Sequence, residues 1–153
     1  MPHIERTAQI VWEGNAARGV GTLTGDSGAF HELGFSLPSR IGKPDGKTSP
    51  EELLAAAHAA CFAMSVASEL TSAGTPPEHL DVTATVTLDQ VEDGSHRIVS
   101  SELLARARVT GVDAAAFERL AQAASEGCTL SKLIEASAKV TVNARLEGGT
   151  DGD

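Results

Sequence analysis

The two cysteines, Cys61 and Cys128, are the residues of this chain best suited to chemistry. They lie far apart in the sequence, and the segment after Met1 has no apolar run of the signal-peptide form. We therefore interpret them as thiols rather than as a structural disulfide. The alternative is that both are inert core residues, since free cysteine often packs as a small apolar side chain.

The sequence around each cysteine predicts a different reactivity. Cys128 directly precedes a short helical stretch, where unpaired backbone N–H groups and the helix dipole lower the pKa of a thiol. Cys61 lies in the middle of a long apolar segment, where desolvation raises the pKa of a thiol. These arguments favour Cys128 unless a cation lies near Cys61. Arg40 is the obvious candidate, because its guanidinium stays charged and can bind both a thiolate and an oxygen ligand.

Glu51 is the second charged residue that could serve a site. Its simplest role is to complement the helix dipole in the first turn, an effect worth about 0.3–1 kcal/mol. Ten residues of straight helix separate it from Cys61, which corresponds to a rise of roughly 15 Å. If both residues serve one site, either the helix is interrupted or each residue comes from a different subunit.

His58 precedes Cys61 by three residues and therefore lies on a neighbouring face of the helix. Together they could form the reactive pair of a hydrolase or isomerase, although no acid that would orient His58 is evident. A zinc site built from His58, Cys61 and Cys128 is a further alternative. The chain has neither a Cys-x-x-Cys motif nor a second clustered histidine, so we expect no metal.

These residues must be positioned by the segment from Thr48 to Gly74. Ser49, Pro50 and Glu52 form the sequence pattern of a capped helix start with a capping box, and Gly74 supplies the stop. The residues between them are apolar or small on nearly every side, which is typical of a helix buried in the middle of a structure. Two small sheets in a chain of this length can cover such a helix only with difficulty. We therefore expect a second subunit to cover the rest, in an obligate homodimer.

The remaining periodicities predict an α+β domain over residues 1–147, with two small antiparallel sheets around the buried central helix. The tail 148–153 is expected to be disordered. The Pro- and Gly-rich segment 36–48, which contains Arg40, is predicted to be a long loop. The expected strands are 4–12, 19–24, 30–35, 82–88, a partner strand ending near 109, and 140–146, and the other expected helices are 114–126 and 130–136.

Composition excludes several classes of partner. The net charge of −9, the absence of a basic cluster and the scarcity of aromatic residues argue against nucleic acid and anionic membranes. The central helix is about long enough to span a membrane, but it contains His58, Glu69 and several serines. We therefore predict a soluble, cytoplasmic protein.

Several motifs together resemble the OsmC/Ohr family of thiol peroxidases over nearly the whole chain. The His-Ala-Ala-Cys-Phe motif and the pair of glutamates are more similar to the osmotically inducible (OsmC) branch than to the organic hydroperoxide resistance (Ohr) branch. The matching residues are Trp12-Glu13-Gly14, Ser49-Pro50-Glu51-Glu52-Leu53, His58-Ala59-Ala60-Cys61-Phe62 and Gly127-Cys128.

This resemblance implies an intertwined α+β homodimer with two active sites at the subunit interface. Cys61 would attack the peroxide O–O bond and become a sulfenic acid, and Cys128 would condense with it to an intrachain disulfide. Arg40, held by Glu51, would stabilise the thiolate and polarise the peroxide. Implied partners are organic hydroperoxides and a dithiol reductant such as a lipoylated protein, with a role in oxidative and osmotic stress defence. The reaction needs no metal or organic cofactor.

Two departures from the family pattern affect the expected site. Thr129 stands where the family commonly has proline after the second cysteine, and the segment 36–48 differs in length and composition. Arg18, which lies just before Gly19, is therefore the alternative catalytic arginine. A competing interpretation is a dimeric, non-enzymatic binding module for small apolar ligands, in which the cysteines are merely packed.

Overall fold

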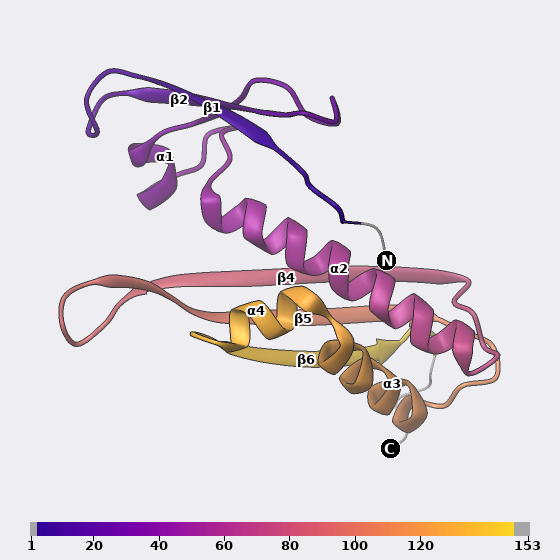
Figure 1. The fold of residues 1–153 in the computed structure, drawn as a ribbon. Helices are drawn as coiled ribbons and strands as arrows, with labels where there is room; N and C mark the ends of the chain where they lie inside the picture. Colours follow the sequence, from indigo (N-terminus) through magenta and orange to yellow (C-terminus); the bar gives the residue numbers. More distant parts are fainter. Residues whose placement is uncertain (1–2, 149–153) are drawn as a thin grey trace. The chain divides into compact units, whose positions relative to one another are not determined.

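The computed structural model describes residues 3–148, which fall into two compact units that divide between Leu53 and Leu54. Each unit has its own three-stranded sheet (Figure 1). A single domain over residues 1–147 stays a prediction. The tail predicted to be disordered lies outside the described residues beyond Gly148.

The N-terminal unit contains an antiparallel meander, as the sequence predicts. Its strands are β1 (Ala8–Glu13), β2 (Val20–Gly25) and β3 (Leu33–Phe35), in the order β1-β2-β3. All residues of β1 are exposed, including Ile10 at 54% and its neighbour Val11 at 53%, whose side chains point to opposite faces. Among the described residues of the N-terminal unit, none covers either face of β1.

A short helix, α1 (Leu37–Ile41), replaces part of the loop predicted for residues 36–48. The Ser39 N–H donates to Ser36 Oγ at 3.2 Å, and the Ser36 N–H donates to Ser39 Oγ at 3.1 Å. These reciprocal bonds form a capping box with serine in place of the usual Glu or Gln, which hides the signal in the sequence. Pro38 lies in the first turn of this helix, where proline is tolerated. Arg40 occupies the last turn.

Helix α2 (Pro50–Ser72) begins and ends where the sequence predicts and runs without interruption. The Glu52 N–H donates to Ser49 Oγ at 3.1 Å, which confirms Ser49 as the cap. The carboxylate of Glu52 does not complete the capping box, because it accepts from the Thr48 hydroxyl at 2.7 Å instead. Gly74, with a φ of +79°, adopts the left-handed conformation that ends many helices.

Burial of α2 within the chain is limited to one stripe. His58, Phe62, Val66 and Leu70 recur every fourth residue and are fully buried, whereas Met64 is 69% exposed. The expectation of burial on every side is therefore not met by one chain. By length and composition α2 could cross a membrane, a test that the core helix of a soluble protein also passes, and its buried stripe packs into the core of the C-terminal unit.

The C-terminal unit combines a mixed sheet with a helical crossover. Its elements are β4 (His79–Gln90), β5 (His96–Arg108), α3 (Ala114–Gly127), α4 (Thr129–Glu135) and β6 (Lys139–Leu146). Strands β4 and β5 pair antiparallel, but β6 pairs parallel with β5. The prediction of two antiparallel sheets was wrong here, because α3 and α4 form the long crossover that returns the chain in the same direction.

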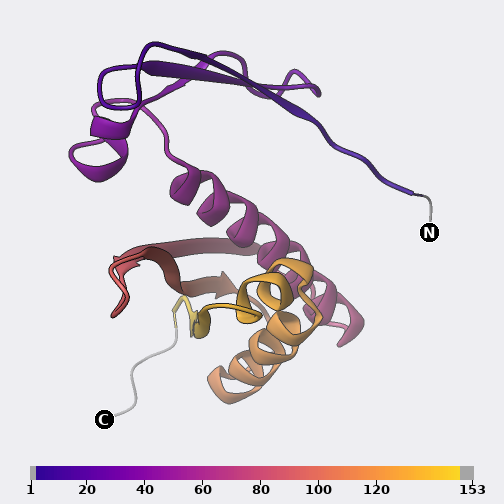
Figure 2. The ribbon, with the colours of Figure 1, turned by 60° about the vertical axis from the view of Figure 1, so that its left-hand side comes forward.

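Helices α2, α3 and α4 cover the same face of this sheet (Figures 1 and 2). On β5, Leu103, Ala105 and Ala107 point into the core beside Phe62 and Phe117. Ser101 belongs to the same inward-facing row and is fully buried. A polar group therefore lies under the helices at the end of an otherwise apolar row.

Candidate active site

The C-terminal unit brings the two cysteines together. Cys128 Sγ lies 3.1 Å from Cys61 Sγ, and both thiols are free. A disulfide has an S–S length of about 2.04 Å, so an approach of roughly 1 Å would allow the bond to form. Cys61 is half-buried and Cys128 is fully buried. Of the two sulfur atoms, that of Cys61 is the one more accessible to an external reactant.

Local structure explains how the cysteines meet. Cys61 precedes Phe62, a member of the buried stripe of α2, and so lies at the edge of that stripe. Cys128 is the single residue between α3 and α4 and serves as the C-cap of one and the N-cap of the other. Its side chain packs into the core rather than capping α4. The turn between α3 and α4 therefore delivers Cys128 to α2.

The surroundings of Cys61 favour its thiolate. Partial burial would raise the pKa of the thiol, but hydrogen bonds outweigh this effect and lower the pKa below its usual value. The bonds come from the Thr129 hydroxyl, the Leu130 backbone, the Cys128 thiol and the Thr129 backbone. Thr129 Oγ1 lies 3.5 Å from Cys61 Sγ.

The sequence argument expected the start of α4 to act on the Cys128 thiol, whereas in the structure these groups contact the sulfur of Cys61. The Cys128 side chain makes no capping bond there, whereas backbone groups of Thr129 and Leu130 stabilise the sulfur of Cys61. No feature of the local sequence signals this contact, because it depends on the packing of α4 against α2.

His58 does not pair with Cys61. Its ring is fully buried, with Nδ1 2.7 Å from Ser101 Oγ and Nε2 2.9 Å from Ser131 Oγ. Ser125 Oγ donates in turn to Ser131 Oγ at 3.2 Å. Since both ring nitrogens are engaged, a Cys61–His58 pair and a zinc site that uses His58 are both disfavoured. Among residues 3–148, no three His, Cys, Asp or Glu side chains form a cluster suited to a metal ion.

The serine partners of His58 were not identified from the sequence. Ser101 could have been noticed as the polar member of an inward-facing apolar row, but Ser125 and Ser131 carry no comparable signal. Together they anchor β5, α3 and α4 to α2 around one imidazole. Burial lowers the pKa of His58, an effect that Glu135 partly opposes.

We expect this buried histidine to make folding stability depend on pH. Because its pKa is lower in the folded chain, the unfolded state binds more protons, so stability rises with pH. The contribution is complete above the unfolded pKa of about 6.5 and is lost as pH falls through the lowered folded value. Urea unfolding of His58→Gln between pH 7.5 and 5.0 should show a smaller loss of unfolding free energy than wild type.

His79→Gln is the matched control, because His79 is exposed on β4. It should keep the wild-type dependence of unfolding free energy on pH. An unchanged dependence in His58→Gln would show that His58 does not titrate in this way.

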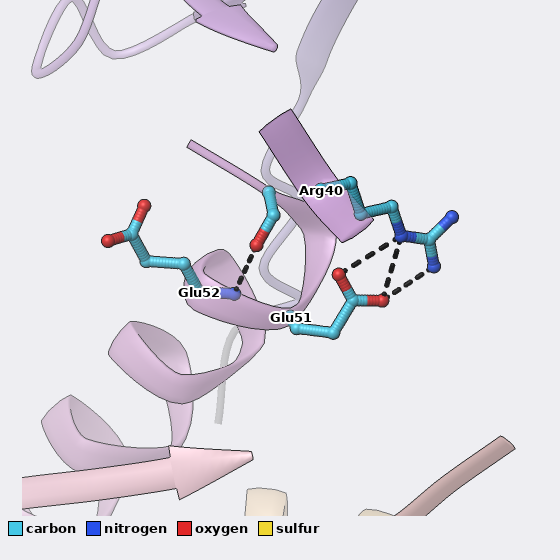
Figure 3. Close-up of polar contacts among 4 residues, drawn as sticks. Arg40, Glu51 and Glu52 are labelled. Carbon is cyan, nitrogen blue, oxygen red and sulfur yellow. Dashed lines mark hydrogen bonds and ion pairs between the residues drawn. The ribbon is translucent and has the colours of Figure 1, made fainter. Parts of the chain in front are cut away.

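The N-terminal unit holds the other two predicted site residues as an ion pair. Arg40 Nε lies 3.1 Å from both carboxylate oxygens of Glu51, and Arg40 Nη2 lies 2.5 Å from Glu51 Oε1 (Figure 3). The Glu51 side chain is 14% exposed and that of Arg40 is 37% exposed. The hydrogen bonds raise the pKa of Arg40 and lower the pKa of Glu51. Glu51 therefore orients Arg40 in addition to lying near the helix start.

An apolar pocket of about 310 Å³ adjoins Arg40 within the same unit. Trp12 and Phe35 form part of its wall, with ring centroids 5.6 Å apart. Gly21, which pairs with Phe35 across the sheet, leaves room for that ring, since a Cβ there would overlap it. The remaining lining residues are Ala16, Ser36, Leu37 and Pro50. This pocket combines apolar walls with one guanidinium.

Arg18, the alternative arginine, lies in an exposed turn where its backbone N–H donates to Asn15 Oδ1 at 2.9 Å. Arg40 has a carboxylate partner and contributes to a pocket. The geometry of the N-terminal unit therefore favours Arg40 as the arginine of a site.

Comparison with known proteins shows which family the chain resembles over most of its length. The OsmC-like protein family matches residues 42–143. The chain is 37% identical over 144 residues to the peroxiredoxin OsmC of Escherichia coli, covering 94% of this chain and 98% of that protein. The crystal structure of the organic hydroperoxide resistance protein OhrB of Bacillus subtilis has a TM-score of 0.68 and 26% identity, covering 92% of this chain and 98% of that one.

A second structural neighbour supports the fold alone. The organic hydroperoxide resistance protein of Elizabethkingia anophelis has a TM-score of 0.73 at 23% identity, covering 96% of this chain and all of that one. The α+β architecture and the similarity to the OsmC branch are thus confirmed. On the match over residues 42–143 and the identity to the Escherichia coli protein, the chain belongs to the OsmC family.

Proposed function

We propose that this protein is a cysteine-based peroxidase that reduces organic hydroperoxides to alcohols. The observation that carries the proposal is the pair of free thiols 3.1 Å apart, whose more accessible member has a lowered pKa. The names of the relatives, a peroxiredoxin and an organic hydroperoxide resistance protein, support the same chemistry.

In the first step, the Cys61 thiolate attacks the terminal oxygen of the hydroperoxide. The S–O bond forms as the O–O bond breaks, and the leaving alkoxide takes up a proton to become the alcohol. Cys61 is oxidised to a sulfenic acid. The Cys128 thiol then attacks the sulfur of Cys61, so that an S–S bond forms and water leaves. A dithiol reductant, such as a lipoylated protein, restores both thiols by exchange.

Arg40 is proposed to stabilise the charge that develops on the leaving oxygen. Glu51 binds Nε and Nη2 of the guanidinium, and within residues 3–148 no hydrogen bond involves Nη1, which can therefore serve the peroxide. The adjoining pocket of Trp12, Phe35 and Leu37 offers an apolar surface for the organic group. We therefore propose that alkyl and aryl hydroperoxides are better substrates than hydrogen peroxide.

We also propose that the active form is a homodimer. Both faces of β1 and the side of α2 that bears Met64 expose apolar side chains that a second subunit could cover. Glu51 and Cys61 lie on one uninterrupted helix, so roughly 15 Å of helical rise separates them. A site that combines Arg40–Glu51 with Cys61–Cys128 is therefore best explained by contributions from two subunits.

We propose that the protein acts in the cytoplasm, because free thiols persist in that reducing compartment.

The test is intact-mass measurement after one equivalent of cumene hydroperoxide without added reductant. Wild type should lose two hydrogens as the Cys61–Cys128 disulfide forms. Cys128→Ser should gain one oxygen, because the sulfenic acid of Cys61 has no partner. Cys61→Ser, the control, should be unchanged.

Two other outcomes would contradict the proposal. Unchanged masses in wild type and in Cys128→Ser would favour the binding module for apolar ligands. A gained oxygen on Cys128 in the Cys61→Ser variant, with turnover retained, would show that Cys128 and not Cys61 attacks the peroxide.

A further inference from the structure

Thr129 is the first residue of α4, and its side chain is exposed beside Cys61. Its Oγ1 lies 3.5 Å from Cys61 Sγ, a normal separation for a hydrogen bond to sulfur. A hydroxyl can donate or accept, but a thiolate can only accept. When Cys61 is ionised, the proton between these two atoms must therefore come from Thr129.

We propose that Thr129 is a further catalytic residue, whose hydroxyl donates a hydrogen bond to the Cys61 thiolate and holds it ready for attack. The inference rests on the proposed peroxidase function only for its consequence on turnover. The hydrogen bond itself concerns the thiol and can be measured without a peroxide.

The hydroxyl of Thr129 is free to play this part. Within the described residues it makes no other hydrogen bond, and it does not cap α4, whose N-cap is Cys128. A hydrogen bond to an ionised acceptor is about twice as strong as one between neutral groups. Ionisation of Cys61 therefore strengthens the contact with a donor that has no competing partner.

A buried hydrogen bond holds the helix that carries this hydroxyl. Ser131, two residues after Thr129, binds His58 Nε2 at 2.9 Å, and His58 lies one helical turn before Cys61 on α2. The His58–Ser131 bond thus joins α4 to α2 within one helical turn of Thr129 on one helix and of Cys61 on the other. The donor is held by the fold rather than by its own packing, as preorganised stabilisation requires.

Thr129 also stands at the position where the resemblance in the sequence analysis implies proline. Proline, which the family pattern commonly has after the second cysteine, suits the first position of a helix but has neither a hydroxyl nor a backbone N–H. Threonine at this position supplies both. Partial burial raises the pKa of the Cys61 thiol, and the hydroxyl and the backbone of Thr129 both lower it. This chain therefore has a donor at Cys61 that proline could not provide.

The experiment measures the rate of Cys61 alkylation by iodoacetamide as a function of pH in full-length wild type, Thr129→Val and Thr129→Ser. Trypsin separates the cysteines, since Cys61 falls in the peptide 48–97 and Cys128 in 120–132, so mass spectrometry follows each one individually. Thr129→Val should move the Cys61 profile to higher pH. Its alkylation rate at neutral pH should fall about fivefold, which corresponds to ~1 kcal/mol, the amount by which a hydrogen bond to the ionised sulfur exceeds one to the neutral thiol. Thr129→Ser should keep the wild-type profile.

Thr71→Val is the matched control, because Thr71 is exposed on the same helix as Cys61 but donates to the backbone of Ala67 at 2.7 Å. It should leave the profile unchanged. An unchanged profile in Thr129→Val, or equal shifts in the Val and Ser variants, would overturn the proposal, because the hydroxyl would then not matter.

A stopped-flow measurement of the first reaction with cumene hydroperoxide separates this inference from the proposed function. A slower first step in Thr129→Val, with the rate retained in Thr129→Ser, supports both. If wild type does not react with the peroxide while the alkylation profiles differ as expected, the peroxidase proposal fails and the thiolate donor stands.

Discussion

Cys61→Ser should lower the rate of hydroperoxide reduction by more than about 10⁴-fold, the order expected when an enzyme loses its nucleophile. Serine places an oxygen where the sulfur lies, but its hydroxyl is far less acidic and cannot form the sulfenic acid or the disulfide. The measurement is consumption of cumene hydroperoxide with dihydrolipoamide as the dithiol reductant. Far-UV circular dichroism should show an unchanged fold, since Cys61 is only half-buried.

Cys128→Ser provides the matched comparison. In this variant the peroxide should oxidise Cys61 in the first turnover at a rate close to that of wild type. The steady-state rate should then depend on how fast the reductant attacks the sulfenic acid. Appreciable steady-state activity in Cys61→Ser would contradict the assignment of Cys61 as the attacking thiol.

Arg40→Gln should slow the oxidation of Cys61 by about 10²–10³-fold, as expected when one preorganised donor to a developing oxyanion is removed. Arg40→Lys should restore little of this rate, because a lysine cannot reproduce the planar fork that binds both oxygens of Glu51. Glu51→Gln should have a smaller effect, since it loosens the guanidinium without removing it. Single-turnover stopped-flow kinetics would give each rate constant.

Arg18→Gln is the control, and it should retain wild-type kinetics. A large loss in Arg18→Gln together with near-normal Arg40→Gln would transfer the role to Arg18. The structure already gives Arg40 a carboxylate partner, whereas Arg18 lies in an exposed turn.

The same variants test the proposed dimer. If each site takes Arg40 from one subunit and Cys61 from the other, co-expressed Arg40→Gln and Cys61→Ser chains form mixed dimers with one intact site. Random assortment then restores about one quarter of wild-type activity, because two-fold symmetry gives every mixed dimer one intact and one doubly altered site. Light scattering should give twice the 15.8 kDa chain mass. No recovery in confirmed mixed dimers would place both residues of a site on one chain.

Most elements were predictable from the sequence because their signals are local. The apolar alternation of β4 and the Ser49–Gly74 limits of α2 agree with the structure, and α3 begins at the predicted residue after its cap, Asp113. Helix α1 was missed because its capping box uses Ser36 and Ser39 instead of a glutamate. The direction of β6 depends on which strand it joins, and no local pattern records that choice.

The candidate site was predictable only in part, for the same reason. The family motifs named Cys61 and Cys128, and the structure brings them together. Glu51 belongs to one of these motifs, whereas Arg40 lies outside them and was proposed as the cation that would be held by Glu51; the two form an ion pair. The partners of His58 and the contact of Thr129 with Cys61 depend on how α4 and β5 pack against α2. Such contacts arise from tertiary structure, so residue types and spacing do not reveal them.

The short distance between the two sulfur atoms also bears on how such a protein would survive its own substrate. A sulfenic acid that meets a second peroxide is converted to a sulfinic acid, which thiols do not reverse. Here the sulfur of the competing Cys128 thiol lies 3.1 Å from that of Cys61. A reactant in this position acts at an effective concentration far above that of any dissolved peroxide. Disulfide formation would therefore be faster than oxidation to the sulfinic acid. The protein would stay active at peroxide concentrations that inactivate thiols without such a neighbour.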